Sequence, residues 1–125
     1  AADANIAAID LHAERANALL AEVAAEHPTV HVVDLAAAVV AVERDGLVVG
    51  EHTLTTGKFG GLLGIDGIHF TDTGYGFLAN LFIDAINAQL GTTLPRVDLA
   101  PIVAQDPERP DRLAAAGLAA CAPTP

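Results

Sequence analysis

The sequence predicts an α/β domain built around a parallel β-sheet. Residues 3–26 and 73–90 repeat apolar side chains at helical spacing, and residues 29–35 are a short, β-branched and nearly continuous apolar run. A strand that is apolar on both faces is typical of a parallel sheet covered by helices. The 125 residues, 52% of them hydrophobic, are enough for one domain with a buried core.

The first predicted helix covers residues 3–26. Its apolar positions recur at steps of three and four, which places them on one face: Ile6, Ile9, Ala13, Ala16, Leu20 and Val23. Pro28 ends the helix, because the residue before a proline is disfavoured in the helical region.

The predicted strand at 29–35 leads into a short, alanine-rich helix that ends near Arg44. Asp34 is placed to cap this helix, and Asp45-Gly46 to stop it. A β-hairpin turning at Asp45-Gly46 is the alternative for the same stretch. Residues 47–49 and 53–55 are further strand candidates. A buried strand needs neighbours, and none precedes this one, so we expect the C-terminal part of a larger α/β domain.

A loop with five glycines, residues 57–67, precedes the last strong helix. That helix is expected to bury one face and to expose Asn80, Asp84 and Asn87 on the other. The expected buried face consists of Tyr75, Leu78, Leu81, Phe82, Ala85 and Ile86. Gly91 ends the helix. Residues 92–125 are rich in proline and alanine, and we expect an extended tail with one turn of helix at 112–120.

Composition excludes several classes of function. Six Lys and Arg against sixteen Asp and Glu give a net charge of -10 and no basic patch, so we expect no nucleic-acid partner. The longest uncharged apolar run in the middle of the chain, residues 35–42, is far shorter than the roughly 20 residues that span a bilayer. The chain contains no Ser, so no Ser nucleophile lies within it. Pro28 breaks the helical spacing of His27 and His31, and we expect neither a metal nor a cofactor.

The strongest candidate site is Asp66 and His69, three residues apart in the glycine-rich loop. In a tight turn, Asp66 can accept a hydrogen bond from the Nδ1–H group of His69. This bond would fix the tautomer and leave Nε2 to take a proton from a nucleophile. Alternatively, Asp66 only caps the turn and His69 is an ordinary histidine.

Residues 60–95 resemble the last sequence block of the SGNH (GDSL-type) ester hydrolases. The matching positions are Asp66-Gly67-Ile68-His69, Thr71, Gly74-Tyr75 and the helix segment 79–87. Where the family has Pro after the histidine, this chain has Phe70, which alters the turn or lines a substrate pocket. The resemblance implies a flavodoxin-like three-layer α/β/α sandwich that hydrolyses carboxylic esters with a Ser-His-Asp triad.

By this resemblance, His69 is the general base and Asp66 orients it. The Ser and the oxyanion hole would lie on an absent N-terminal half of the domain, in the same or a separate chain. Residues 1–91 would then be the C-terminal part of the hydrolase domain, and residues 92–125 an extension. The expected substrate is an ester or lipid, and this chain alone should be inactive. The resemblance favours a secreted or cell-envelope protein, while the residues themselves do not indicate a compartment.

Two alternatives stay open. One is a non-catalytic α/β module for binding or assembly, and the other is a degenerate homologue that has lost its nucleophile.

Thr residues near the loop and Cys121 in the tail are poor replacements for a Ser nucleophile. Thr needs special activation, and Cys121 lies in a proline-rich segment.

Overall fold

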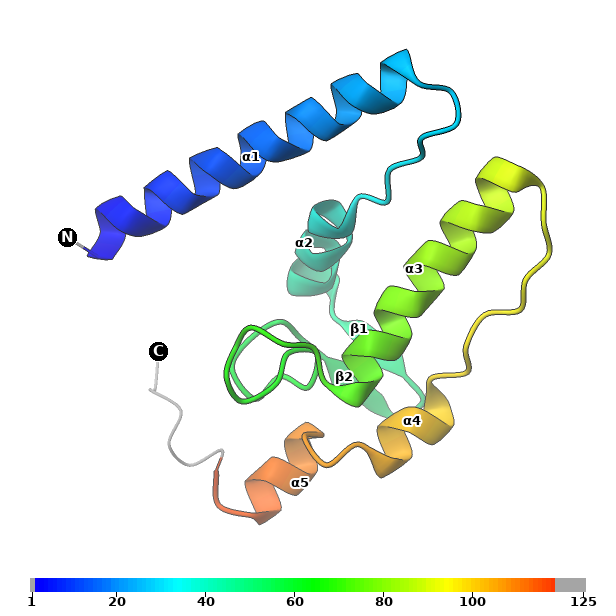
Figure 1. The fold of residues 1–125 in the computed structure, drawn as a ribbon. Helices are drawn as coiled ribbons and strands as arrows, with labels where there is room; N and C mark the ends of the chain where they lie inside the picture. Colours follow the sequence, from blue (N-terminus) through cyan, green and yellow to red (C-terminus); the bar gives the residue numbers. More distant parts are fainter. Residues whose placement is uncertain (1, 119–125) are drawn as a thin grey trace. The chain divides into compact units, whose positions relative to one another are not determined.

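The structure, a computed structural model, describes residues 2–118, with side-chain burial from residue 9 onward. Its elements, shown in Figure 1, are α1 (Ala2–Glu26), α2 (Leu35–Asp45), β1 (Leu47–Val49), β2 (His52–Leu54), α3 (Asp72–Leu90), α4 (Ala100–Gln105) and α5 (Pro110–Ala115). The chain divides into two compact units, one ending at Val33 and one beginning at Asp34. The first consists of α1 and the segment after it, and the second holds all other elements.

The predicted fold class is wrong. The described residues are mostly helical, and their one sheet is the antiparallel pair of β1 and β2, with Leu47 opposite Leu54. This is neither a parallel sheet nor a flavodoxin-like three-layer α/β/α sandwich. Residues 29–35 form no strand, and Val30 and Val32 are 41% and 46% exposed. A β-branched run favours extended backbone, but a strand also needs a neighbour for its hydrogen bonds, and no described residue supplies one.

The predicted helices are confirmed at α1 and α2. The Asp34 side chain accepts a hydrogen bond of 2.8 Å from the Ala37 N–H group and so caps α2. Because α2 continues to Asp45, the alternative hairpin at Asp45-Gly46 is wrong. The chain turns instead between β1 and β2, where Gly50 has a φ of 60°.

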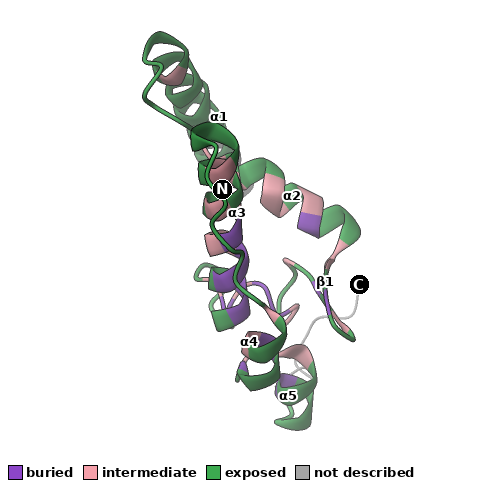
Figure 2. Cartoon of the chain, turned by 90° about the vertical axis from the view of Figure 1, so that its right-hand side faces the viewer, coloured by how far each residue is buried: buried purple, intermediate pink, exposed green. Residues whose placement is uncertain are grey.

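The core of the second unit consists of two clusters of buried side chains, and Figure 2 marks the buried positions along the chain. One cluster consists of Val42, Leu62 and Phe77, from α2, the glycine-rich loop and α3. A second consists of Val49, Leu54 and Val103, from β1, β2 and α4. Leu47 and Leu99 pack against both clusters. Leu62 therefore attaches the glycine-rich loop to the packed core.

The helix α3 confirms the predicted element but not its predicted faces. Gly91, at a φ of 64°, ends it as expected. Tyr75 and Phe82 are 51% and 49% exposed, whereas Asn80 is only 2% exposed. Asn80 is buried because its amide pairs with the backbone of Val97: Nδ2 donates to the carbonyl oxygen at 3.0 Å, and Oδ1 accepts from the N–H group at 2.7 Å.

Asn87 repeats this pairing two helical turns later on α3. Its Nδ2 donates to the Leu94 carbonyl oxygen at 2.9 Å, and its Oδ1 accepts from the Leu94 N–H group at 2.7 Å. An asparagine amide offers one donor and one acceptor side by side, which matches an extended backbone. The two asparagines therefore hold residues 94–97 along α3.

We expect the Asn80→Ala substitution to lower the free energy of unfolding by about 1–3 kcal/mol, because two backbone groups of Val97 lose their partners. Urea unfolding monitored by circular dichroism measures this loss. Asn87→Ala is the matched control: it removes the same kind of pair at a more solvent-accessible place, so its cost should be smaller. A cost for Asn80→Ala no larger than that of the control would contradict this account.

The segment after α3 differs from the predicted extended tail. The helices α4 and α5 each have a proline in their first turn, Pro101 and Pro110, where a missing N–H group leaves no hydrogen bond unmade. Val103 and Leu113 bury their side chains, at 3% and 6% exposure. Of the expected helical turn at 112–120, residues 119 and 120 lie outside the described residues, as does Cys121.

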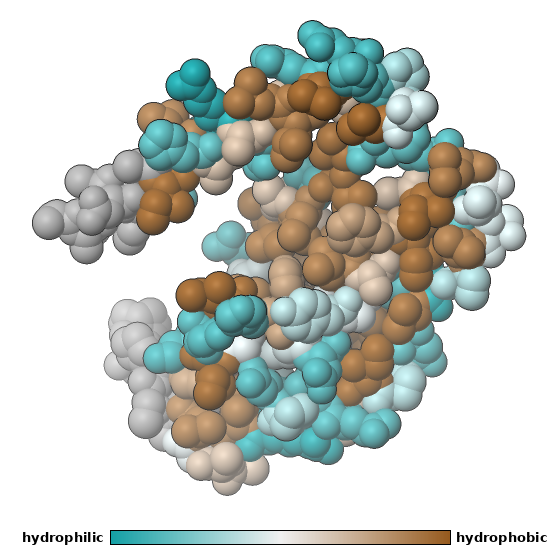
Figure 3. Space-filling view, viewed as in Figure 1, coloured by the Kyte–Doolittle hydropathy of each residue, from teal (hydrophilic) through white to brown (hydrophobic). Residues whose placement is uncertain are grey.

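Apolar side chains remain on the surface of the second unit. Val40, Val48 and Leu90 are each more than half exposed. Figure 3 shows such hydrophobic side chains among the hydrophilic ones on one face of the molecule. Within residues 2–118, every helix is too short or too polar to span a membrane.

Candidate active site

The candidate site is a tight turn at the end of the glycine-rich loop, residues 64–69, which we call the Asp66 turn. An antiparallel bridge between Leu63 and Phe70 closes its base. The Gly64 N–H group donates to the His69 carbonyl oxygen at 2.7 Å, and the Gly67 N–H group to the Gly64 carbonyl oxygen at 2.9 Å. Gly67, at a φ of 70°, takes a left-handed conformation that suits glycine. The backbone therefore brings residues 66 and 69 to the same side.

The Asp66 carboxylate uses both oxygens inside this turn. Oδ1 accepts from the N–H groups of Ile68 and His69 at 2.9 and 3.0 Å, which is the local pairing that makes Asp frequent in turns. Oδ2 lies 2.7 Å from Nδ1 of His69. The predicted hydrogen bond between Asp66 and His69 is thus confirmed, and Asp66 also caps the turn.

These bonds keep Asp66 ionised. The hydrogen bond from His69, followed by those from the Ile68 and His69 N–H groups, lowers the pKa of Asp66 to about 2. At neutral pH Asp66 is ionised and can only accept hydrogen bonds. Nδ1 of His69 therefore carries the proton of the hydrogen bond between the two side chains. A neutral His69 then presents an unprotonated Nε2. Its side chain is 72% exposed, so Nε2 is accessible to a substrate or a nucleophile.

We expect the hydrogen bonds of Asp66 to be fully present above its ordinary pKa of 3.8 and to be lost as the pH falls through about 2. The sign follows from linkage: a carboxyl whose pKa is lower in the folded state stabilises that state only while ionised. Proton–nitrogen NMR of the Ile68 and His69 amides should follow this titration. The Asp66→Asn variant should lack it, and amide shifts that change only above pH 4 would contradict the assignment.

The segment after His69 locks the turn to α3. Thr71 is 4% exposed; its hydroxyl donates to the Gly61 carbonyl oxygen at 2.8 Å and accepts from the Gly74 N–H group at 3.0 Å. A Cβ atom at position 74 would lie 2.2 Å from the Leu62 carbonyl oxygen, so only glycine permits this approach. Phe70 packs against the first core cluster, with its ring edge-on to Tyr75 at 5.8 Å.

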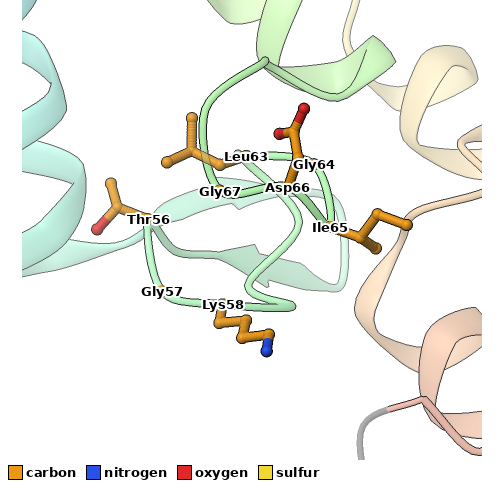
Figure 4. Close-up of a pocket in the computed structure, with 8 residues that line it drawn as sticks. All are labelled: Thr56, Gly57, Lys58, Leu63, Gly64, Ile65, Asp66 and Gly67. Carbon is orange, nitrogen blue, oxygen red and sulfur yellow. The ribbon is translucent and has the colours of Figure 1, made fainter.

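A shallow depression of about 400 Å³ lies beside the turn. Its lining residues, shown in Figure 4, are Thr56, Gly57, Lys58, Leu63, Gly64, Ile65, Asp66 and Gly67. The side chains of Asp66 and Lys58 point in opposite directions there, so Lys58 is not the partner of the carboxylate. Phe70, which the sequence suggested as a residue that could line a substrate pocket, does not line this depression.

Two carboxylates missed by sequence reasoning contact the same region. Asp106, 1% exposed, accepts from the Thr73 N–H and hydroxyl groups at 2.9 and 2.6 Å. Glu108 Oε2 accepts from the Ile65 N–H group at 3.1 Å. These pairs lie 33 and 43 residues apart in the sequence, so no local pattern indicates them. Among the described residues, no group of three or more His, Cys, Asp or Glu side chains is arranged to hold a metal ion.

No protein-family model, curated protein or solved structure matches this chain. The resemblance to SGNH hydrolases therefore stays a prediction from the motif at 66–87. The geometry of Asp66 and His69 stands independently of it, because it follows from the hydrogen bonds of the turn.

Proposed function

We propose that the chain supplies the general base and its orienting carboxylate to a carboxylic ester hydrolase of the SGNH type. The observation that carries this proposal is the 2.7 Å contact between His69 Nδ1 and Asp66 Oδ2, with an accessible Nε2. This is the arrangement that a serine hydrolase requires of its histidine and acid. The motif that contains the two residues supports the same assignment.

The nucleophile must then come from outside these 125 residues, since they contain no Ser. Nε2 of His69 takes the proton from the Ser hydroxyl as its oxygen attacks the ester carbonyl carbon. The same nitrogen then gives that proton to the departing alkoxide. Asp66 stays ionised throughout and stabilises the imidazolium that forms between these two steps. Water repeats the sequence on the acyl-enzyme and restores the Ser.

The test compares this chain with the complete product of its coding sequence on a short-chain nitrophenyl ester. We expect hydrolysis by the complete product, which would include the Ser-bearing segment, and none by the 125-residue chain alone. Coding sequence upstream of Ala1 should show a strand that ends at a Gly-Asp-Ser turn. Hydrolysis by the isolated chain would contradict the assigned division of the site.

A complete product without esterase activity would favour one of the alternatives, a binding or assembly module or a homologue without its nucleophile. Labelling with a fluorophosphonate separates these from a wrong choice of ester. The probe reacts with an activated Ser whatever acyl chain the enzyme prefers. Absence of both hydrolysis and labelling would overturn the proposed function.

A further inference from the structure

The residues of the Asp66 turn are mostly exposed, so contacts with residues outside the turn must hold it in place. Ile65, Asp66, Ile68 and His69 are all exposed, and the hydrogen bonds within the turn fix its shape but not its position. A catalytic group misplaced by about 1 Å can lose about 100-fold in rate. The connector between α4 and α5, residues 106–109, contacts both the turn at Ile65 and the start of α3, which follows the turn.

On the side that follows His69, the connector holds the start of α3 through Asp106. Its Oδ2 accepts from the N–H and hydroxyl groups of Thr73, and both residues are almost completely buried, at 1% and 0% exposure. A carboxylate at a helix N-terminus satisfies N–H groups that have no partner within the helix and interacts favourably with the helix dipole. This contact is therefore a rigid anchor four residues beyond His69.

On the side that precedes Asp66, the same connector contacts the turn through Glu108. Glu108 Oε2 accepts from the Ile65 N–H group at 3.1 Å, and a Cβ atom at position 64 would lie 2.8 Å from this oxygen. The Glu108 N–H group in turn donates to Asp106 Oδ1 at 2.9 Å. The two anchors are thus connected to each other through the two oxygens of Asp106.

We propose that the connector 106–109 is a clamp and that Glu108 is a positioning residue for the Asp66–His69 pair. Asp106 fixes the connector to the buried start of α3, and Glu108 transmits that position to the residue before Asp66. Only the effect of the clamp on catalysis depends on the proposed function. Its effect on the position of the turn can be measured without any substrate.

The decisive variants are Glu108→Ala, which removes the acceptor, and Glu108→Gln, which keeps an acceptor oxygen at the same distance from the backbone. Glu43→Ala, an exposed glutamate on α2, is the matched control for loss of charge. Nitrogen NMR of the 125-residue chain reports the His69 tautomer, and hydrogen exchange reports protection of the Ile65 amide. We expect Glu108→Ala to speed exchange at the Ile65 amide, with Glu108→Gln and Glu43→Ala close to the unmodified chain. The His69 tautomer should stay the same in all three variants, because the bonds within the turn set it.

In the complete product, Glu108→Ala should lower kcat for ester hydrolysis about tenfold while KM stays within about twofold. The reason is that the substitution displaces the general base but leaves substrate binding unchanged. Glu108→Gln should restore kcat. Unchanged exchange at the Ile65 amide in Glu108→Ala, or loss of its protection in Glu108→Gln, would overturn the clamp. If the complete product neither hydrolyses an ester nor reacts with the fluorophosphonate, the proposed function fails, while the exchange results still decide the clamp.

Discussion

On the proposed function, replacing His69 by Ala should abolish ester hydrolysis by the complete protein. Under the proposed function, the Ser hydroxyl without an acceptor for its proton is a poor nucleophile, and kcat should fall by about 10⁶-fold, as for loss of the catalytic histidine in subtilisin. KM should change little, because His69 Nε2 contributes to proton transfer more than to substrate binding. Burst-phase and steady-state assays with a nitrophenyl ester measure both quantities.

His12→Ala provides the control for this experiment. His12 is an exposed histidine of α1, in the first unit, and it lies outside the candidate site. Its replacement should leave kcat unchanged. Free imidazole added to the His69→Ala protein should restore part of the activity, since a small base can enter the space left by the ring. If His69→Ala kept most of the activity, His69 would have no place in the mechanism.

Replacing Asp66 by Asn should lower kcat by about 10⁴-fold while leaving the turn folded. The Asn oxygen can still accept from the Ile68 and His69 N–H groups, so the backbone of the turn keeps its bonds. The Asn amide nitrogen, however, donates a hydrogen bond where the carboxylate accepted one. His69 then accepts at Nδ1 and carries its proton on Nε2, where it cannot act as a base.

The His69 tautomer makes this prediction measurable apart from activity. Nitrogen NMR of the ring should show a protonated Nδ1 in the unmodified chain and a protonated Nε2 in Asp66→Asn. Asp72→Asn is the matched control, because it removes the same charge from an exposed position only three residues beyond His69. Equal tautomers in the unmodified chain and in Asp66→Asn would contradict the role assigned to Asp66.

The candidate pair was predictable because it depends on local structure alone. An Asp three residues before a His, with Gly67 between them, can close a turn by bonds that involve no distant residue. The helices α1, α2 and α3 were predictable for a similar reason. Their apolar spacing, the cap at Asp34 and the stop at Gly91 act within a few residues of each helix.

The predicted parallel sheet failed for the opposite reason. Residues 29–35 have the composition of a buried strand, but a strand exists only where neighbours complete its hydrogen bonds, and the described residues provide none. The predicted buried and exposed faces of α3 were wrong for a similar reason. Asn80 looks like a surface residue by type, yet it is buried because its amide matches the backbone of Val97, seventeen residues away.

The sequence by itself therefore determined the helices α1, α2 and α3, the shape of the Asp66 turn and the chemistry that its two side chains can perform. Only the tertiary structure decided what holds that turn in place. Asp106 and Glu108 lie in a segment whose prolines predict an extended tail. Two of those prolines, however, lie in the first turns of α4 and α5, and the connector between these helices returns to the site. Local propensity cannot indicate such contacts, because they are selected by the packing of residues far apart in the chain.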